Sequence, residues 1–343
     1  TSNGGAAESI RARLGSKRLW LAPMAGVSEP VFRVLCLEQG AGLAFTEMIS
    51  AKGLEYENPN TDALLRLGDG ESEVAVQLFG DEPEPIARQA AILSERMGDT
   101  LALIDINMGC PVGKVVKKGA GAALMKDPDR AVRIISACCA ATDRPVTAKF
   151  RRGFKMGDDT CEAFARSLRG AGAAAIAVHG RYAEQYYGGR SDPDAIARVK
   201  QAVDIPVIAS GDLTTPEAVR DTLERTRADG AMLARGARGN PWLFPRAYAL
   251  LSGDAEAAAL LPTIDERVAM ARRHTRGLAK IDGHLMLRMR QNFTAYFRSV
   301  PHASAYRSRV NTCSTLEEFE ALYDEILVDA RRFAETHGEE AER

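Results

Sequence analysis

The sequence predicts an α/β protein, a (β/α)8 TIM barrel followed by a C-terminal all-helical domain of about four helices. Short apolar segments alternate with helix-length segments through the first two thirds of the chain. Polar or glycine-rich residues follow the apolar segments, and no further strand pattern occurs after Pro245. We therefore expect a barrel domain over residues 1–245 and a helical domain over residues 246–343.

Eight apolar segments have the length and composition of buried parallel strands. They cover residues 19–22, 43–45, 74–78, 102–106, 146–150, 174–178, 207–209 and 231–233. Helical patterns between them include residues 84–91, 129–140, 161–168, 194–203 and 215–223. A doubly wound open sheet would give a similar alternation. Polar signals at successive strand ends favour a closed barrel, because barrel active sites are built from the ends of several strands.

The composition is that of a globular protein with 343 residues, 45% hydrophobic residues and a net charge of -1. No segment approaches the roughly 18 uninterrupted apolar residues of a membrane helix. The first residues lack the apolar core of a secretion signal, so we expect a cytoplasmic protein. The six cysteines do not have metal-ligand spacing. We expect them to be thiols, and we predict no metal site.

The helical patterns of the C-terminal part cover residues 254–260, 264–278, 284–297 and 316–335. Basic residues are concentrated between residues 264 and 310. They are Arg267, Arg272, Arg273, Arg276, Lys280, Arg288, Arg290, Arg298, Arg307 and Arg309. Such a surface can bind a phosphate backbone, because the guanidinium fork matches phosphate geometry. A solvated set of helix faces is an equally good interpretation.

The ends of the last two predicted strands form a candidate phosphate site. Ser210, Gly211 and Asp212 follow the seventh strand, and Ala234 and Arg235 follow the eighth. In barrels of this kind these loops commonly bind phosphate, and glycine lets backbone N–H groups approach the anion. The sequence therefore predicts a phosphorylated cofactor or substrate.

Two other strand ends carry reactive groups. Lys149 ends the fifth strand, where its ammonium could stabilise charge on a bound ring or form a Schiff base. Cys110 follows the fourth strand, and a thiol near its usual pKa of ~8.5 can donate a proton. The next loop carries Lys114, Lys117 and Lys118. Nearby lysines would lower the thiol pKa and favour a nucleophilic thiolate, so both roles of Cys110 remain open.

Several motifs occur in order along the predicted barrel. They are Leu21-Ala-Pro-Met-Ala-Gly26, Val76-Gln-Leu-Phe-Gly80, Asn107-Met-Gly-Cys-Pro-Val-Gly-Lys-Val115, Lys118-Gly-Ala-Gly-Ala-Ala-Leu-Met125, Lys149-Phe-Arg-Arg-Gly153, His179-Gly-Arg181 and the segment 235–242. Together they resemble the bacterial tRNA-dihydrouridine synthases, most closely the B-type subfamily. The helical remainder has the length of that family's RNA-binding domain.

The resemblance implies FMN as cofactor, NADPH as its reductant and a D-loop uridine of tRNA as substrate. Cys110 would be the general acid, which protonates C5 of the uracil after hydride addition at C6. The residues that would contact FMN are Pro23, Met24, Ala25, Gln77, Lys149, His179, Ser210, Gly211, Asp212, Ala234 and Arg235. The residues that would contact the substrate are Asn107, Arg181, Arg288 and Arg290.

The chain departs from the family pattern at two positions, with Ser210 where asparagine is usual and Ala234 where glycine is usual. Both positions can act through backbone N–H groups, so we expect phosphate binding to be retained. The alternatives are an FMN-dependent dehydrogenase of a free pyrimidine and a catalytically silent RNA-binding or regulatory homologue. The arginine-rich helices argue against the first, and Cys110, Lys149 and His179 argue against the second. We expect the protein to act as a monomer.

Overall fold

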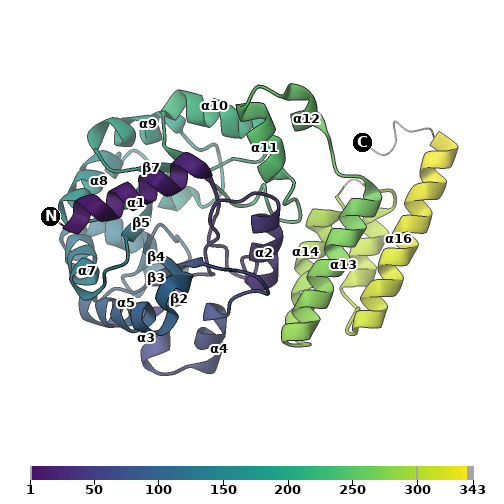
Figure 1. Cartoon of the computed structure of the whole chain (residues 1–343), viewed down its shortest axis with the longest axis horizontal. Coiled ribbons are helices and arrows are strands. Elements are labelled where there is room, and N and C mark those ends of the chain that lie inside the picture. The colour runs from purple at the N-terminus through teal and green to yellow at the C-terminus, as the bar shows by residue number, and fades with distance from the viewer. Residues whose placement is uncertain (1, 299, 338–343) are drawn as a thin grey trace.

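The computed structural model describes residues 2–298 and 300–337, and it shows a parallel barrel with a helical domain packed on one side (Figure 1). The strands are hydrogen-bonded in the order β1-β8-β7-β6-β5-β4-β3-β2. They are β1 (Leu19–Leu21), β2 (Ile49–Ser50), β3 (Val74–Phe79), β4 (Leu101–Met108), β5 (Val146–Gly153), β6 (Ala175–Tyr182), β7 (Val207–Ser210) and β8 (Gly230–Leu233). The predicted barrel with a helical extension is confirmed.

The barrel closes between β1 and β3 through residues 43–46, which do not form a regular strand. Leu21 pairs with Ala44 and Phe45 pairs with Ala75, each as an isolated parallel bridge. The second predicted strand therefore occupies its expected place but makes only single bridges to its neighbours. The two-residue strand β2 continues this position and pairs with β3.

Helices cover the outside of the barrel, and several of them are longer than the helical segments predicted from the sequence. The longer ones are α5 (Pro83–Met97), α7 (Pro128–Ala141), α8 (Cys161–Gly170), α9 (Pro193–Ala202), α10 (Pro216–Thr226) and α11 (Leu243–Leu251). Many begin with proline behind a capping side chain, as α7 does with Asp127, which accepts the Arg130 N–H. Short helical turns are α3 (Ala51–Glu55), α4 (Pro59–Asp62), α6 (Gly113–Val116), η1 (Ala63–Leu65), η2 (Gly98–Thr100), η3 (Gly121–Lys126) and η4 (Ala183–Gln185).

Two helices near the N-terminus are not predicted by the sequence, α1 (Ser2–Ser16) and α2 (Pro30–Glu38). Helix α1 buries Ile10 and Leu14 in a cluster with Trp20 of β1. Ile10 and Leu14 lie one helical turn apart, but the rest of the segment is small or polar, so the sequence gives only a weak helical period there.

The helical domain has its own apolar cluster, which begins at Ile264 and continues to Ala330. Its helices are α12 (Ala255–Ala259), α13 (Ile264–Ile281), η5 (Leu285–Arg288), α14 (Met289–Tyr296), α15 (Ala303–Val310) and α16 (Leu316–His337). The expected domain boundary after residue 245 lies inside α11, whose Leu243 and Ala247 belong to the barrel core. None of the described helices is both long and apolar enough to cross a membrane.

A buried hydrogen-bond chain joins the barrel to the helical domain. Glu29 caps α2, and its carboxylate accepts the N–H groups of Val31 and Phe32. The same carboxylate lies 2.6 Å from Nε2 of His274 on α13. Nδ1 of His274 lies 3.0 Å from the hydroxyl of Tyr296 on α14. Glu29 belongs to the barrel and His274 to the helical domain, and both side chains are buried. This hydrogen-bond chain therefore couples the two domains.

Replacing Glu29 by alanine should destabilise the protein by about 2–4 kcal/mol, because it removes a helix cap and leaves a buried imidazole without its partner. Urea denaturation followed by circular dichroism would measure the change. The control is Glu38→Ala, which removes an exposed ion pair with Arg273 and should cost less than about 1 kcal/mol. Equal losses in the two variants would contradict a special role for the buried pair.

Candidate active site

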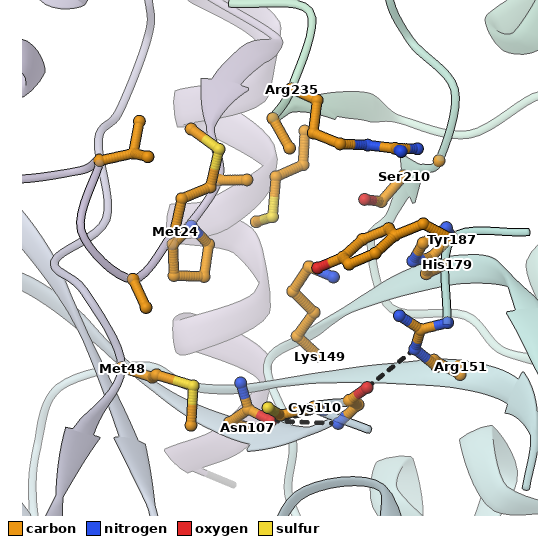
Figure 2. A pocket seen from close by; sticks show the side chains of 18 of the residues that line it. Met24, Met48, Asn107, Cys110, Lys149, Arg151, His179, Tyr187, Ser210 and Arg235 are labelled. Atoms are coloured by element: carbon orange, nitrogen blue, oxygen red, sulfur yellow. Dashed lines mark hydrogen bonds between the residues drawn. The ribbon is translucent and has the colours of Figure 1, made fainter. Parts of the chain in front are cut away.

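A cavity of about 380 Å³ opens at the carboxyl ends of the barrel strands. Many of its lining residues were predicted from the sequence. They are Pro23, Met24, Ala25, Gln77, Asn107, Cys110, Lys149, His179, Ser210, Gly211, Asp212, Ala234 and Arg235. Figure 2 shows several of these side chains converging on one space. Arg181, Arg288 and Arg290 are not among the lining residues.

A chain of hydrogen bonds runs beside the cavity from Asp105 to Cys110. The buried Asp105 carboxylate accepts from Oγ1 of Thr147 and from Nε2 of Gln77, each at 2.6 Å. Oε1 of Gln77 accepts from Nδ2 of Asn107 at 2.8 Å. Oδ1 of Asn107 accepts from the backbone N–H of Cys110 at 2.9 Å. The chain therefore links a buried charge to the loop that carries the thiol.

The ionised carboxylate sets the direction of every bond in this chain. A carboxylate only accepts hydrogen bonds, so Gln77 must turn its NH2 group toward Asp105 and its oxygen toward Asn107. Asn107 must then turn its oxygen toward the Cys110 N–H. Burial raises the pKa of Asp105 to about 6, although the hydrogen bonds from Gln77 and Thr147 oppose this shift. The carboxylate is therefore ionised at neutral pH.

The thiol of Cys110 is half-buried at the start of the loop after β4. Burial raises its pKa, and Arg151 and Lys149 offset only part of this effect. The loop lysines at positions 114, 117 and 118 are exposed and are not among the groups that shift this pKa. Of the two roles left open for Cys110, the raised pKa favours the protonated thiol, because the loop lysines do not offset the effect of burial.

Gly121 allows η3 to pack closely against the Cys110 loop. Its φ is +59°, and a Cβ added there would lie 2.8 Å from the carbonyl oxygen of Cys110. The same oxygen accepts the N–H of Ala122 at 3.0 Å. The glycine motif over residues 118–125 thus holds the backbone of the cysteine loop in place, so a larger residue at position 121 would displace it.

Lys149 lies among the side chains in the middle of Figure 2. Burial lowers its pKa to about 8, and Arg151 adds to this effect, whereas Asp105 and Cys110 oppose it. Asp105 acts through space, because its oxygens accept from Gln77 and Thr147. No carboxylate among the described residues forms an ion pair with this ammonium. An anionic or electron-rich ligand atom would supply the missing partner.

His179 is neutral in this site. Burial lowers its pKa well below the usual value, and the positive charges of Lys149, Arg151, Arg181 and Arg235 lower it further. Its Nε2 lies 3.3 Å from Nη1 of Arg181. Because a guanidinium only donates, Nε2 must accept this bond and the ring proton resides on Nδ1.

Arg181 lies behind the wall of the cavity. Its side chain is 2% exposed and forms a bidentate ion pair with Asp212 at 2.7 and 2.8 Å. Arg181 thus positions His179 and Asp212, contrary to the expectation that it contacts the substrate. Arg235 also contacts Asp212, at 3.1 Å. The two arginines neutralise the Asp212 carboxylate. Because a carboxylate only accepts hydrogen bonds, Asp212 can offer an anion only its backbone N–H.

Gly211 brings the backbone of the predicted phosphate loop close to the cavity wall. Its φ is +114°, and an added Cβ would lie 2.6 Å from Cδ2 of His179 and would also collide with Ser191. Only glycine fits at this position. The loop over residues 210–212 therefore depends on it for its path.

Other lining residues were not predicted, including Met48, Tyr186, Tyr187 and Arg238. The ring of Tyr187 lies 4.6 Å from the Arg235 guanidinium and 5.8 Å from that of Arg151. Two adjacent tyrosines shortly after a strand end are the sequence signal that could have identified this wall. No sequence signal identifies Met48 as a lining residue, because it follows residues 43–46, which do not form a regular strand.

Arg288 and Arg290 lie in the helical domain and have internal partners. Arg288 pairs with Glu47, whose second oxygen accepts the Gly26 N–H at 2.6 Å. Arg290 donates to the carbonyl of Cys313 at 2.6 and 2.9 Å. Ion pairs also occupy Arg272, Arg273, Arg276, Lys280 and Arg309. Much of the basic excess is therefore compensated within the fold.

Comparisons with known proteins identify a family and relatives that match most of the chain. The family model "Dihydrouridine synthase (Dus)" matches residues 20–332. The chain is 36% identical over 316 residues to tRNA-dihydrouridine synthase B of Vibrio vulnificus (strain CMCP6), covering 90% of this chain and 96% of that protein. It is 38% identical over 311 residues to tRNA-dihydrouridine synthase B of Pseudomonas syringae pv. tomato (strain DC3000), covering 88% and 90%.

A solved structure with the same barrel fold is histamine dehydrogenase from Rhizobium sp. 4-9. The TM-score is 0.50 at 12% identity, and the match covers 76% of this chain and 49% of that chain. At this identity the similarity concerns the fold alone.

Proposed function

The chain belongs to the dihydrouridine synthase family, and we propose that it reduces the C5–C6 double bond of a D-loop uridine in tRNA, with Cys110 as proton donor. Reduction of this bond requires a hydride at C6 and a proton at C5, because hydride addition leaves enolate-like charge across C5 and O4. The observation that carries the proposal is the protonated Cys110 thiol, which shares a cavity with the unpaired ammonium of Lys149.

The cavity residues fit FMN. The volume of about 380 Å³ lies within the range of cofactor sites, and Lys149 lacks an anionic partner. Lys149 and Gln77 would hold the pyrimidine edge of the flavin, Met24 with its neighbours its ring, and Arg235 with the backbone of residues 210–212 its phosphate. When bound, FMN supplies the hydride, which it receives from NADPH.

The chain's own residues perform the remaining steps. Cys110 holds the proton at Sγ until it passes to C5 of the base. Asn107 fixes the backbone of that loop and keeps one N–H of its Nδ2 for the base. His179, which is neutral, offers the Nδ1 proton as a hydrogen-bond donor.

The proposed partner of the helical domain is the tRNA backbone, since a base inside folded tRNA must be extruded to reach the cavity. Arg288 and Arg290 would contact phosphates through the guanidinium N–H groups that their internal bonds leave over. Action on tRNA implies a cytoplasmic location. We propose that one chain suffices, which size-exclusion chromatography with light scattering would test.

The proposal is tested with purified protein and unmodified tRNA. We expect a yellow protein that releases FMN on denaturation and is reduced by NADPH without oxygen. Incubation with tRNA should add two hydrogen atoms to a uridine, as detected by mass spectrometry. Turnover of free uracil but not of tRNA would support a free-pyrimidine dehydrogenase. A protein that binds tRNA but no flavin would be a silent homologue.

Asp105→Asn should lower dihydrouridine formation by about 10-fold, because the loss of one charged hydrogen-bond acceptor lets the amides of Gln77 and Asn107 turn. The wild-type rate should fall as pH decreases through about 6, where the carboxylate takes up a proton. The variant should lack this acid limb. An unchanged pH profile in Asp105→Asn would contradict the role of Asp105 in setting the chain.

A further inference from the structure

A second cavity, of about 510 Å³, lies between the barrel and the helical domain. It shares Asp212, Thr214, Arg235, Gly236 and Arg238 with the first cavity. The second cavity therefore begins where the predicted phosphate site of the first one ends. A ligand that extends out of the first cavity in this direction enters the second one.

The wall of the second cavity is strongly basic. Its arginines are Arg235, Arg238, Arg246, Arg267 and Arg298. Asp212 is the one carboxylate among its lining residues, and Arg181 and Arg235 already bind it. In the described part of the chain, the other four arginines of this wall form no ion pair with a carboxylate. The wall thus carries an excess of positive charge.

Neutral acceptors hold these guanidinium groups in place without cancelling their charge. Nε of Arg238 donates to Oδ1 of Asn292 at 2.9 Å, and its Nη2 donates to the carbonyl of Gln291 at 2.7 Å. Nε of Arg246 donates to the carbonyl of Ala258 at 2.8 Å. Each guanidinium keeps further N–H groups for a ligand.

Arg238 and Arg298 bring like charges near each other. Burial lowers the pKa of Arg238, and the charge of Arg298 lowers it further. Arg246 differs, because Glu217 lies close enough to oppose the lowering of its pKa. An anion between Arg238 and Arg298 would relieve their repulsion and accept their unused N–H groups.

We propose that this cleft binds the 2′-phosphate of the reducing nucleotide and so selects NADPH over NADH. The inference rests on the proposed function, which takes a nicotinamide nucleotide as the reductant. The continuity of the two cavities favours one extended dinucleotide, with its nicotinamide end in the first cavity. The half-buried, tethered guanidinium of Arg238 suits a discrete phosphate better than a long backbone that crosses an open face.

The test compares Arg298→Gln with wild type as FMN-loaded protein in the absence of RNA. Arg298 is exposed, so its replacement should leave folding intact. Anaerobic stopped-flow reduction should show the NADPH-to-NADH preference reduced by about 10-fold, as expected for one lost charged hydrogen bond. Calorimetric titration with adenosine 2′,5′-bisphosphate should show a similar loss of affinity. The matched control is Arg166→Gln on the exposed face of α8.

Unchanged nucleotide preference and bisphosphate affinity in Arg298→Gln would overturn the proposal. A loss of tRNA affinity in a filter-binding assay, with nucleotide preference retained, would assign the cleft to RNA and overturn it equally. If neither nucleotide reduces the wild-type flavin, the proposed function fails instead. The bisphosphate titration would still decide whether the cleft binds this phosphate. Arg238→Gln provides a second variant, whose folding is checked separately because Arg238 also ties the barrel to α14.

Discussion

Cys110→Ala should lower dihydrouridine formation by about 10³-fold, within the usual contribution of a general acid, while NADPH still reduces the bound flavin. The variant removes the proton that C5 needs and leaves the hydride path intact. The raised thiol pKa keeps the proton on Cys110 at neutral pH, as the proposed role of proton donor requires. His179 cannot replace it easily, because its imidazole is already neutral and gives up a proton only with difficulty.

The measurement is dihydrouridine formed per enzyme in a single turnover, beside the rate of anaerobic flavin reduction. The control is Cys139→Ala on α7, which removes a half-buried thiol that is not among the residues lining the cavity. It should retain activity within about twofold, as is usual for changes outside the site. Full activity of Cys110→Ala on tRNA would show that another group supplies the proton. Parallel loss of flavin reduction would indicate misfolding.

The barrel could be predicted because each buried parallel strand is a short apolar segment, visible without knowledge of its neighbours. The segment 43–46 marks the limit of this approach. Its residues are apolar, but whether they pair as a regular strand depends on the path of β1 and β3. Helices α1 and α15 were missed for a related reason, since α15 contributes only Tyr306 and Val310 as buried residues.

The cavity residues could be predicted because strand ends are local features and the barrel brings all of them to one face. Their partners could not be predicted. Asp105 supports Gln77 across a strand pair, and Arg288 reaches Glu47 from another domain. The loop lysines illustrate the opposite error. They follow Cys110 closely in sequence, but they point into solvent and leave the thiol pKa to burial.

Lys149→Met should weaken FMN binding by about 10- to 100-fold, the range for a lost hydrogen bond to a charged group, and should also slow flavin reduction. In the free protein the pKa of Lys149 is lowered to about 8. An electron-rich flavin edge favours the ammonium form and raises this pKa. FMN affinity should therefore be complete below pH 8 and fall as the pH rises through that value.

Fluorescence titration of the apoprotein with FMN between about pH 7 and 9.5 would measure this dependence, whose limiting slope is about tenfold per pH unit for one proton. Lys149→Met should bind weakly with a flat profile, because it has no proton to lose. Lys117→Met removes an exposed loop lysine and should keep the wild-type profile. A profile that still falls above pH 8 in Lys149→Met would assign the titration to another group. The buried ammonium would then not be what the flavin site requires.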